Sequence, residues 1–309
     1  MGKPLVLDDS HLMVVDHVSR CDLSIKQIVH FDAHSDLSLL KDKANDGNVL
    51  TWWLTRHEVD EIFWVLPTRL VERIHSSGLA VIYSFVPTAV SDSLQPANTI
   101  GIATLQLPSN TKLTLIEASD LPHIPTTPEL WLDFDLDFLS FEPEPQQWFS
   151  TYQAEIKRIA SRAEIVSLAL SFAFGTTRHQ DLTWTIPLWQ SCNRSSAYVP
   201  SLTRTFSLQD ESQACLQALT QHLVSDVDRQ LRVLFYHGQL HEFMTKVEKA
   251  IQLHYPLQRE TTYLLPMAYL LTGQYSQAIA QFDQEYTENN NLYAQYAKNI
   301  VQKVQNNLT

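Results

Sequence analysis

Two segments of this sequence run from continuous apolar residues directly into clustered acids. The segment IKQIVHFDAHSDL (25–37) ends with two aspartates and a histidine, and ELWLDFDLDFL (129–139) carries aspartate at alternate positions. Continuous apolar runs of this kind are typical of strands in a parallel sheet that is covered on both faces. Ligands of open α/β sheets bind at the carboxyl ends of the strands, so we expect both acidic segments to lie at that edge.

The rest of the first two thirds of the chain alternates between predicted strands and predicted helices. Besides the two acidic segments, we expect strands in PLVLDD (4–9), HLMVVDH (11–17), GLAVIYSFVP (78–87) and AEIVSLALSFAFG (163–175). Helical patterns cover residues 50–66, 68–78 and 145–163. Strands that alternate with helices predict a doubly wound α/β domain with a mainly parallel sheet, for which we take residues 1–206.

From residue 207 onward the pattern is helical, and we expect a second, all-α region over 207–309. Gly-Gln pairs that begin at Gly238 and Gly273, 35 residues apart, each fall at an expected turn between helices. The second copy, MAYLLTGQYSQAIAQF, resembles a tetratricopeptide repeat, whose period is about 34 residues. Two weak copies are too few for a free-standing solenoid, so we expect this region to pack on the α/β domain. It either stabilises that domain or binds a peptide or another partner.

Composition excludes several classes of function. The net charge is −12, from 22 basic against 34 acidic residues, and no Lys/Arg block occurs, which argues against nucleic-acid binding. No apolar stretch approaches the 18 residues of a membrane span, and the first residues lack a signal-peptide pattern. The three cysteines are widely spaced and odd in number, as in a reduced protein. We therefore expect a cytoplasmic protein that binds neither nucleic acid nor a membrane.

Strand alternation predicts that the acids of each segment share one side. One set is Asp32, His34 and Asp36, and the other is Asp133, Asp135 and Asp137. We expect His30 to point away from them. Carboxylates that converge in this way repel one another, and divalent cations are the usual remedy. Oxygen-rich ligation with one or two imidazoles favours Mn²⁺ over Zn²⁺, and the number of acids predicts two ions.

Three short motifs resemble those of the ureohydrolases, the superfamily of arginases and agmatinases. DAHSD (32–36) matches the Asp-Ala-His-x-Asp motif, and FDLD (134–137) matches Phe-Asp-x-Asp. The pair Asp16-His17 is similar to the Asp-His pair upstream of them. The residues in and around these motifs look most like those of the divergent peptide arginase branch, and the resemblance covers roughly residues 4–185. It implies a three-layer αβα domain of the arginase/deacetylase type.

The resemblance also implies the ligands and the chemistry. The manganese ligands would be His17, Asp32, His34, Asp36, Asp135 and Asp137, with Asp32 and Asp135 shared between the two ions. His11 is the alternative to His17, and Asp133 has no counterpart among the family's ligands, so we expect it to act as a salt-bridge partner. A water between the ions would attack the guanidinium carbon. Asp32 and Asp36 would be the catalytic residues, with Asp36 passing the proton to the departing amine.

The chain also departs from the arginase pattern. Arginases carry a Gly-Asn-Leu-His stretch after the first motif; Gly47 and Asn48 match it, but Leu50 stands in place of the histidine. We expect Asn48 to contact substrate and regard hydrolysis of free arginine as disfavoured. The glutamate with which arginases bind the guanidinium is also missing. Its role would fall to another carboxylate; the candidates are Glu142, which we rank first, Glu144, Asp181 and Asp9.

These features together predict a dimanganese hydrolase that converts arginine side chains of a ribosomally made precursor peptide into ornithine and urea. An arginine-containing peptide is therefore the expected partner. Three alternatives stay open. The chain could hydrolyse a small free guanidine compound, act as a deacetylase-type amide hydrolase, or bind peptides on the same fold without turnover.

Overall fold

The computed structural model describes residues 5–38, 44–79, 82, 86, 94–97, 100–221, 223–224, 226–289, 294–295, 297–299, 301–302 and 305. The chain divides into two compact units, one formed by residues 1–173 and 177–221 and the other by 174–176 and 222–309. We placed the boundary after residue 206, whereas the helix that follows belongs to the first unit. Within the described residues, we find no helix with the length and apolar character needed to span a membrane.

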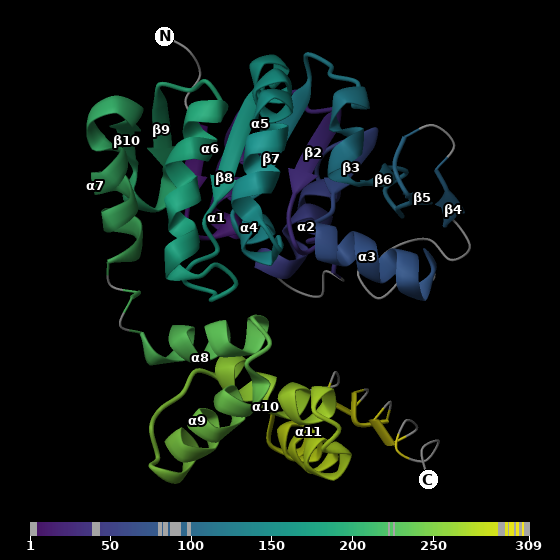
Figure 1. Cartoon of the computed structure of the whole chain (residues 1–309), viewed down its shortest axis with the longest axis vertical. Helices are drawn as coiled ribbons and strands as arrows, with labels where there is room; N and C mark the ends of the chain where they lie inside the picture. The colour runs from purple at the N-terminus through teal and green to yellow at the C-terminus, as the bar shows by residue number, and fades with distance from the viewer. Residues whose placement is uncertain are drawn as a thin grey trace. The chain divides into compact units, whose positions relative to one another are not determined.

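The first unit contains the sheet and the second is helical (Figure 1). The strands are β1 (Leu5–Asp8), β2 (Gln27–Phe31), β3 (Glu61–Val65), β4 (Gln95–Pro96), β5 (Ala103–Gln106), β6 (Lys112–Ile116), β7 (Leu130–Asp135), β8 (Ile165–Ala169), β9 (Ser196–Val199) and β10 (Arg204–Ser207). The helices of the first unit are α1 (His11–Arg20), α2 (Val49–Leu54), α3 (Thr68–Ser77), α4 (Asp137–Phe141), α5 (Pro145–Arg162), α6 (Thr185–Ser191) and α7 (Leu208–Thr220). Those of the second are α8 (Val227–Tyr236), α9 (Leu240–Gln252), α10 (Arg259–Leu271) and α11 (Tyr275–Asn289).

The strands of the described residues form one ten-stranded, mostly parallel sheet in the order β10-β9-β1-β8-β7-β2-β3-β6-β5-β4. The strands from β9 to β6 pair in parallel, and the outer pairs are antiparallel. From β2 the chain continues to β3 on one side, and from β7 it continues to β8 on the other. The neighbours β2 and β7 therefore flank a topological switch point, where α/β sheets open a crevice for ligands. The expected α/β class is confirmed.

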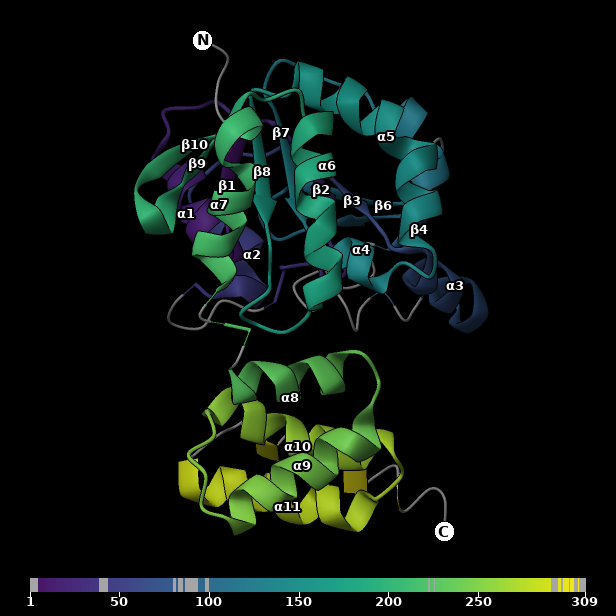
Figure 2. The same cartoon turned by 60° about the vertical axis from the view of Figure 1, so that its left-hand side comes forward.

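Helices cover both faces of the sheet, with α1 and α2 on one face and α5 and α6 on the other (Figure 2). Ile28 and Trp131 point to the α1 side and join its buried valines in one hydrophobic cluster. On the opposite face Phe31 of β2 stacks on Phe134 of β7, with ring centroids 4.8 Å apart, and Trp148 of α5 packs edge-on against Phe31. Each fully buried apolar side chain of this size stabilises the folded state by roughly 1.5–3 kcal/mol relative to an exposed one. Because both faces of the sheet are covered, successive residues of these strands are all apolar.

Residues 11–17, which we expected to form a strand, lie in helix α1 instead. The side chain of Ser10 accepts a hydrogen bond from the backbone N–H of Met13 and caps the helix. The buried residues of the helix are His11, Val14, Val15 and Val18, a spacing that belongs to one helical face. The strand prediction was wrong because the cap at Ser10 and this spacing both favour a helix.

The helix expected over residues 50–66 is also only partly present. Helix α2 ends at Leu54, and residues 61–65 form strand β3 between β2 and β6. The sequence of β3, EIFWV, is rich in β-branched and aromatic residues, which favour a strand. Most of the strand expected over 78–87 lies outside the described residues.

The second unit repeats a helix–turn–helix arrangement. Gly238 lies between α8 and α9 and Gly273 between α10 and α11, both with φ of +76°, a conformation that glycine adopts without strain. The turns expected at the two Gly-Gln pairs are thereby confirmed. The unit has its own hydrophobic core, in which Phe243 of α9 and Phe282 of α11 are fully buried. The C-terminal region is helical, as expected.

Candidate metal centre

Aspartates and histidines from α1, from β2 and the loop that follows it, from β7 and from the start of α4 converge at the carboxyl ends of β2 and β7. They are His11, His30, Asp32, His34, Asp36, Asp133, Asp135 and Asp137. Apart from His34, whose side chain is 44% exposed, none is exposed by more than 5%. Charged side chains at such burial need partners or a metal. The two acidic segments therefore meet, as their positions after core strands predicted.

The backbone delivers these side chains differently from the predicted strand alternation. Strand β2 ends at Phe31, and residues 32–38 are irregular, with Asp36 in the left-handed region at φ of +52°. The carbonyl oxygen of Asp36 accepts a hydrogen bond from the N–H of Leu50, which fixes this turn. At the other segment β7 ends at Asp135, and Asp137 begins helix α4. A loop and a helix start thus gather side chains that we had placed on straight strands.

One group of ligand atoms surrounds Nδ1 of His11. This atom lies 2.6 Å from Oδ2 of Asp36 and 3.7 Å from Oδ2 of both Asp32 and Asp135. Divalent cations with oxygen and nitrogen ligands at roughly 2.0–2.5 Å hold neighbouring ligand atoms about 3–3.5 Å apart. Four side chains from three separate parts of the sequence therefore present atoms at spacings close to those of a single coordination shell.

A second group lies on the other side of Asp32. Nδ1 of His34 is 2.9 Å from Oδ2 of Asp137 and 3.5 Å from Oδ1 of Asp32. Asp32 thus directs one oxygen to each group, Oδ2 to the first and Oδ1 to the second. Asp135 is fixed by two hydrogen bonds, because its Oδ2 accepts one from Ser171 at 2.5 Å and its Oδ1 accepts one from the N–H of Asp137. A carboxylate that faces two groups of ligands, as Asp32 does, suits two adjacent cations.

Asp133 orients two of the histidines. Its Oδ2 lies 2.8 Å from Nε2 of His11 and 2.9 Å from Nδ1 of His30, and its Oδ1 accepts a hydrogen bond from Ser167. An ionised carboxylate only accepts hydrogen bonds, so both of these ring nitrogens carry protons. When the rings are neutral, the lone pairs lie on Nδ1 of His11 and Nε2 of His30. A carboxylate that fixes the tautomer of a histidine in this way is the usual partner of a metal-binding imidazole.

Three buried atoms of the cluster have no hydrogen-bond partner among the described residues: Nδ1 of His11, Nε2 of His30 and Oδ2 of Asp36. Each of the two nitrogens lies beside a carboxylate oxygen. Nε2 of His30 is 3.4 Å from Oδ2 of Asp32, and Nδ1 of His11 is 2.6 Å from Oδ2 of Asp36. With neutral rings, these contacts bring lone pairs and carboxylate oxygens together, which is repulsive unless a proton or a cation lies between them. The residues present therefore fit a bound divalent cation.

The electrostatics of the cluster lead to the same conclusion. Burial, followed by the neighbouring carboxylates with Asp137 foremost, raises the pKa of Asp32 and of Asp135 well above the usual range. Burial also raises the pKa of Asp133, but His11 and His30 outweigh it and the net shift is downward. At Asp133 the histidines therefore outweigh burial, whereas at Asp32 and Asp135 burial and the neighbouring carboxylates outweigh the protein groups that lower the pKa. A cation between them would stabilise their ionised forms.

His17, the upstream ligand implied by the family motif, lies elsewhere. Its ring packs against Tyr198 of β9 with centroids 4.6 Å apart, and the ligand groups found in the described residues do not include it. In helix α1 residue 17 is six positions after His11 and leaves the buried face on which His11, Val14 and Val18 lie. The structure brings His11, the alternative that we had ranked second, into the cluster.

His30 was expected to point away from the acids, and this expectation was wrong. Residues 30 and 32 differ by two, so the alternation of a strand already places them on one side. The register pairs His30 with Asp133 across β2 and β7, which explains their contact. The alternation of side chains along the strand could therefore have identified His30 as a member of the cluster from the sequence alone. Ser171 is a further member that sequence reasoning missed, because it reaches Asp135 from the end of another strand, β8.

The three expected substrate-binding residues are held by the protein itself. The side-chain oxygen of Asn48 accepts a hydrogen bond from the N–H of Asn45 in a capping box. The buried carboxylate of Glu142 accepts one from the N–H of Thr68 at 2.8 Å and lines a cavity. Asp181 forms a two-pronged ion pair with Arg178, at 2.7 and 3.1 Å, and accepts a hydrogen bond from Ser140.

Searches of protein-family models, of curated proteins and of solved structures find no match to this chain. The cluster itself consists of buried histidine and aspartate groups close enough to hold a metal ion. Imidazole nitrogens and carboxylate oxygens in this mixture are ligands that first-row divalent cations accept.

Proposed function

We propose that this chain is a dimanganese hydrolase that cleaves the guanidinium group of arginine side chains in a peptide, giving ornithine side chains and urea. The observation that carries the proposal is Asp32, whose two carboxylate oxygens face two different groups of histidine and aspartate ligands. A bridging carboxylate at the switch point of a parallel sheet supports a pair of cations in a ligand crevice.

The residues of the cluster would have the following roles in this reaction. His11, Asp32, Asp36 and Asp135 would hold one ion, and Asp32, His34, Asp135 and Asp137 the other. Bound divalent cations supply Lewis-acid polarisation and activation of water at neutral pH. Asp36 would accept and return a proton at its Oδ2, which has no hydrogen-bond partner among the described residues. Asp133 keeps His11 and His30 in the required tautomer.

Two features support a peptide-bound rather than a free arginine. Leu50, at the position of the arginase histidine, is fully buried in the core and holds no acid–base group. Asn48, which follows the matching Gly47, is committed to its capping box. The loop that would recognise the α-amino and α-carboxyl groups of a free amino acid therefore serves the fold here.

The experiment that tests this function combines metal content with product mass. The protein is dialysed against Mn²⁺, its metal is quantified, and it is incubated with an arginine-containing peptide. We expect about two ions per chain and, in the mass spectrum, the loss of one cyanamide unit (CH₂N₂) per arginine. Asp32→Asn should abolish both. Hydrolysis of agmatine or arginine without any change in peptides would contradict the peptide substrate, and metal binding without any turnover would contradict the enzyme.

We also propose finer fold assignments for the two units. Parallel strands covered on both faces, with acids at the ends of β2 and β7, support a domain of the arginase and deacetylase type. Paired helices with Gly-Gln turns in the second unit support a tetratricopeptide-like arrangement. Such helix pairs commonly provide a surface for peptides, which is consistent with a peptide substrate.

A further inference from the structure

A cavity of about 430 Å³ lies beside the start of helix α5, next to the elements that build the metal centre. Its lining includes Thr68, Glu72, Glu142, Glu144, Trp148 and Tyr152. Thr68 begins α3 directly after the parallel strand β3, and Glu142 follows α4, which follows β7. Both segments leave carboxyl ends of parallel strands, so the cavity opens at the same edge of the sheet as the metal centre.

The carboxylates of this cavity lack ion-pair partners within the described part of the chain. No lysine, arginine or histidine of that part forms an ion pair with Glu72, Glu142 or Glu144. Arg69, on the same helix as Glu72, partly offsets the rise in the pKa of Glu142 by its charge, but it forms no ion pair with Glu142 and does not line the cavity. Burial raises the pKa of Glu142, the most enclosed of the three. A cationic group that entered the cavity would relieve this cost.

The aromatic wall of the cavity also suits a cation. Trp148 and Tyr152 both line the cavity, and their rings lie 5.1 Å apart. Aromatic rings beside carboxylates attract guanidinium and ammonium groups. A basic side chain of a peptide offers such a group.

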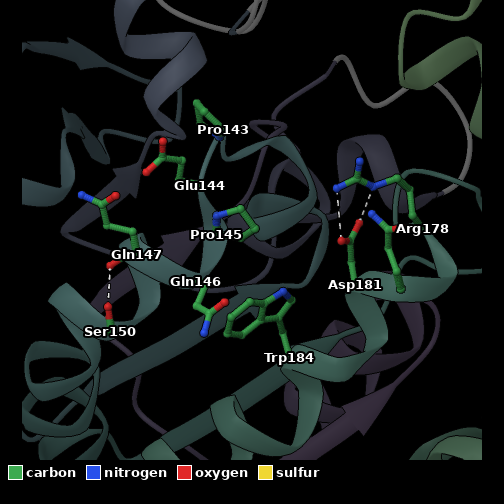
Figure 3. A pocket seen from close by; sticks show the side chains of 10 residues that line it. Pro143, Glu144, Pro145, Gln146, Gln147, Ser150, Arg178, Asp181 and Trp184 are labelled. Atoms are coloured by element: carbon green, nitrogen blue, oxygen red, sulfur yellow. Dashed lines mark hydrogen bonds and ion pairs between the residues drawn. The ribbon is translucent and has the colours of Figure 1, made fainter.

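A second cavity, of about 820 Å³, adjoins the first along the segment Pro143–Gln147. Figure 3 shows Glu144 and Gln147 on one side of Pro145 and the paired Arg178 and Asp181 on the other. The side-chain amides of Gln146, Gln147 and Gln180 line this cavity, and each can donate to and accept from a peptide backbone. Because Asp181 neutralises Arg178, the arginine does not repel a basic ligand strongly.

We propose that these adjoining cavities bind an extended peptide along Pro143–Gln147, with a basic side chain of the peptide in the cavity of Glu72, Glu142 and Glu144. The inference rests on the proposed function only for the peptide nature of the substrate, and it deepens it by assigning a pocket that selects a positive charge. It requires neither bound metal nor turnover.

Calorimetry on the full chain in the presence of EDTA tests the pocket. The probes are capped alanine pentapeptides with arginine, lysine or citrulline at the second and fourth positions. We expect the arginine and lysine peptides to bind at least about tenfold more tightly than the uncharged citrulline peptide. Glu142→Gln and Glu72→Gln should each remove most of this preference. The amide oxygen introduced by Glu142→Gln can still accept the hydrogen bond from the N–H of Thr68, so the fold is retained.

Two controls make the result decisive. Glu58→Gln removes an equal charge outside both cavities, from a side chain that is 95% exposed, and should leave all affinities unchanged. Trp184→Leu alters the second cavity and should weaken the charged and uncharged peptides alike. Equal affinity for arginine and citrulline peptides, no binding of any peptide, or an effect of Glu58→Gln as large as that of Glu142→Gln would overturn the pocket. Charge-selective binding without hydrolysis under Mn²⁺ would overturn the proposed enzyme and leave the pocket in place.

Discussion

At the scale of single residues, the site is decided by which side chains can reach one another at full burial. His11 and Asp133 are nearly unexposed, and they contact each other across an interval of 122 positions in the sequence. His17 carries the same imidazole in the same helix but faces Tyr198. Ligand identity therefore depends on the face of helix α1, and the two histidines form a matched pair for experiment.

Replacing His11 with alanine should weaken Mn²⁺ binding strongly, by about 100-fold or more, because it removes the nitrogen around which the first ligand group gathers. His17→Ala should leave the affinity unchanged. Titration calorimetry of both variants measures this difference, with circular dichroism to verify that each is folded. Retained binding in His11→Ala together with loss in His17→Ala would restore the ligand that the family motif implied.

The three cysteines should differ sharply in reactivity. Burial raises the pKa of Cys192 and Cys215 to about 12, and both side chains are nearly inaccessible, whereas Cys21 is partly exposed. Because the thiolate is the nucleophile, iodoacetamide at pH 8 should modify Cys21 first in the native protein. Peptide mapping detects the order. All three should react in denaturant, and fast modification of Cys192 before unfolding would contradict the described packing.

At the scale of elements, the centre depends on where strands stop. β2 and β7 each end within or beside an acidic motif, and the chain then turns into a loop or a helix that redirects the next acid. The sheet that holds these ends in place includes the β5–β6 hairpin, whose entry at Gly101 is tightly packed. A Cβ at Gly101 would come within 2.4 Å of the carbonyl oxygen of Leu115.

Gly101→Ala should therefore destabilise the protein more than Gly78→Ala. Both glycines have positive φ, +89° and +82°, so both substitutions strain the backbone, but a Cβ at Gly78 meets no atom within 4 Å. The additional steric overlap should cost about 1–3 kcal/mol in the free energy of unfolding. Urea denaturation of the two variants measures the difference. Equal losses would indicate that the approach to Leu115 does not constrain the hairpin.

At the scale of the whole molecule, the chain has two compact units with separate hydrophobic cores. The proposed ligands all lie in the first unit. A cation that binds only the folded site stabilises it by about 2.7 kcal/mol at a free concentration of 100 times Kd. This stabilisation should be greatest at backbone amides that donate hydrogen bonds to the proposed ligands. Examples are the N–H groups of Ala33 and His34, which donate to Asp137 and Asp32.

Hydrogen exchange followed by mass spectrometry should show this localisation. Mn²⁺ should slow exchange in peptides that cover residues 27–38 and 130–141, and leave those from α9 and α10 unchanged. Mg²⁺ and a metal-free sample are the controls for ion identity and for drift. Equal slowing in α9 and α10 would mean that the ion acts outside the proposed centre.

Much of the fold and the acids of the site could be predicted because both follow from local patterns. Continuous apolar runs identified β1, β2, β7 and β8, and the two motifs supplied Asp32, Asp36, Asp135 and Asp137. The sequence could not rank His11 above His17 once α1 was read as a strand. The short strands β9 and β10 were missed because their patterns are weak and their pairing is set by distant neighbours.

The sequence by itself determined the class of fold, the change to a helical region and the presence of two acidic motifs at strand ends, because hydrophobic periodicity and residue chemistry are local. Only the tertiary structure decided which imidazoles join the acids. It also showed that Asn48 and Asp181 are held by internal partners, and that Glu142 lines a cavity beside the site. These outcomes depend on register and helix rotation, where a change of one residue moves a side chain to another face.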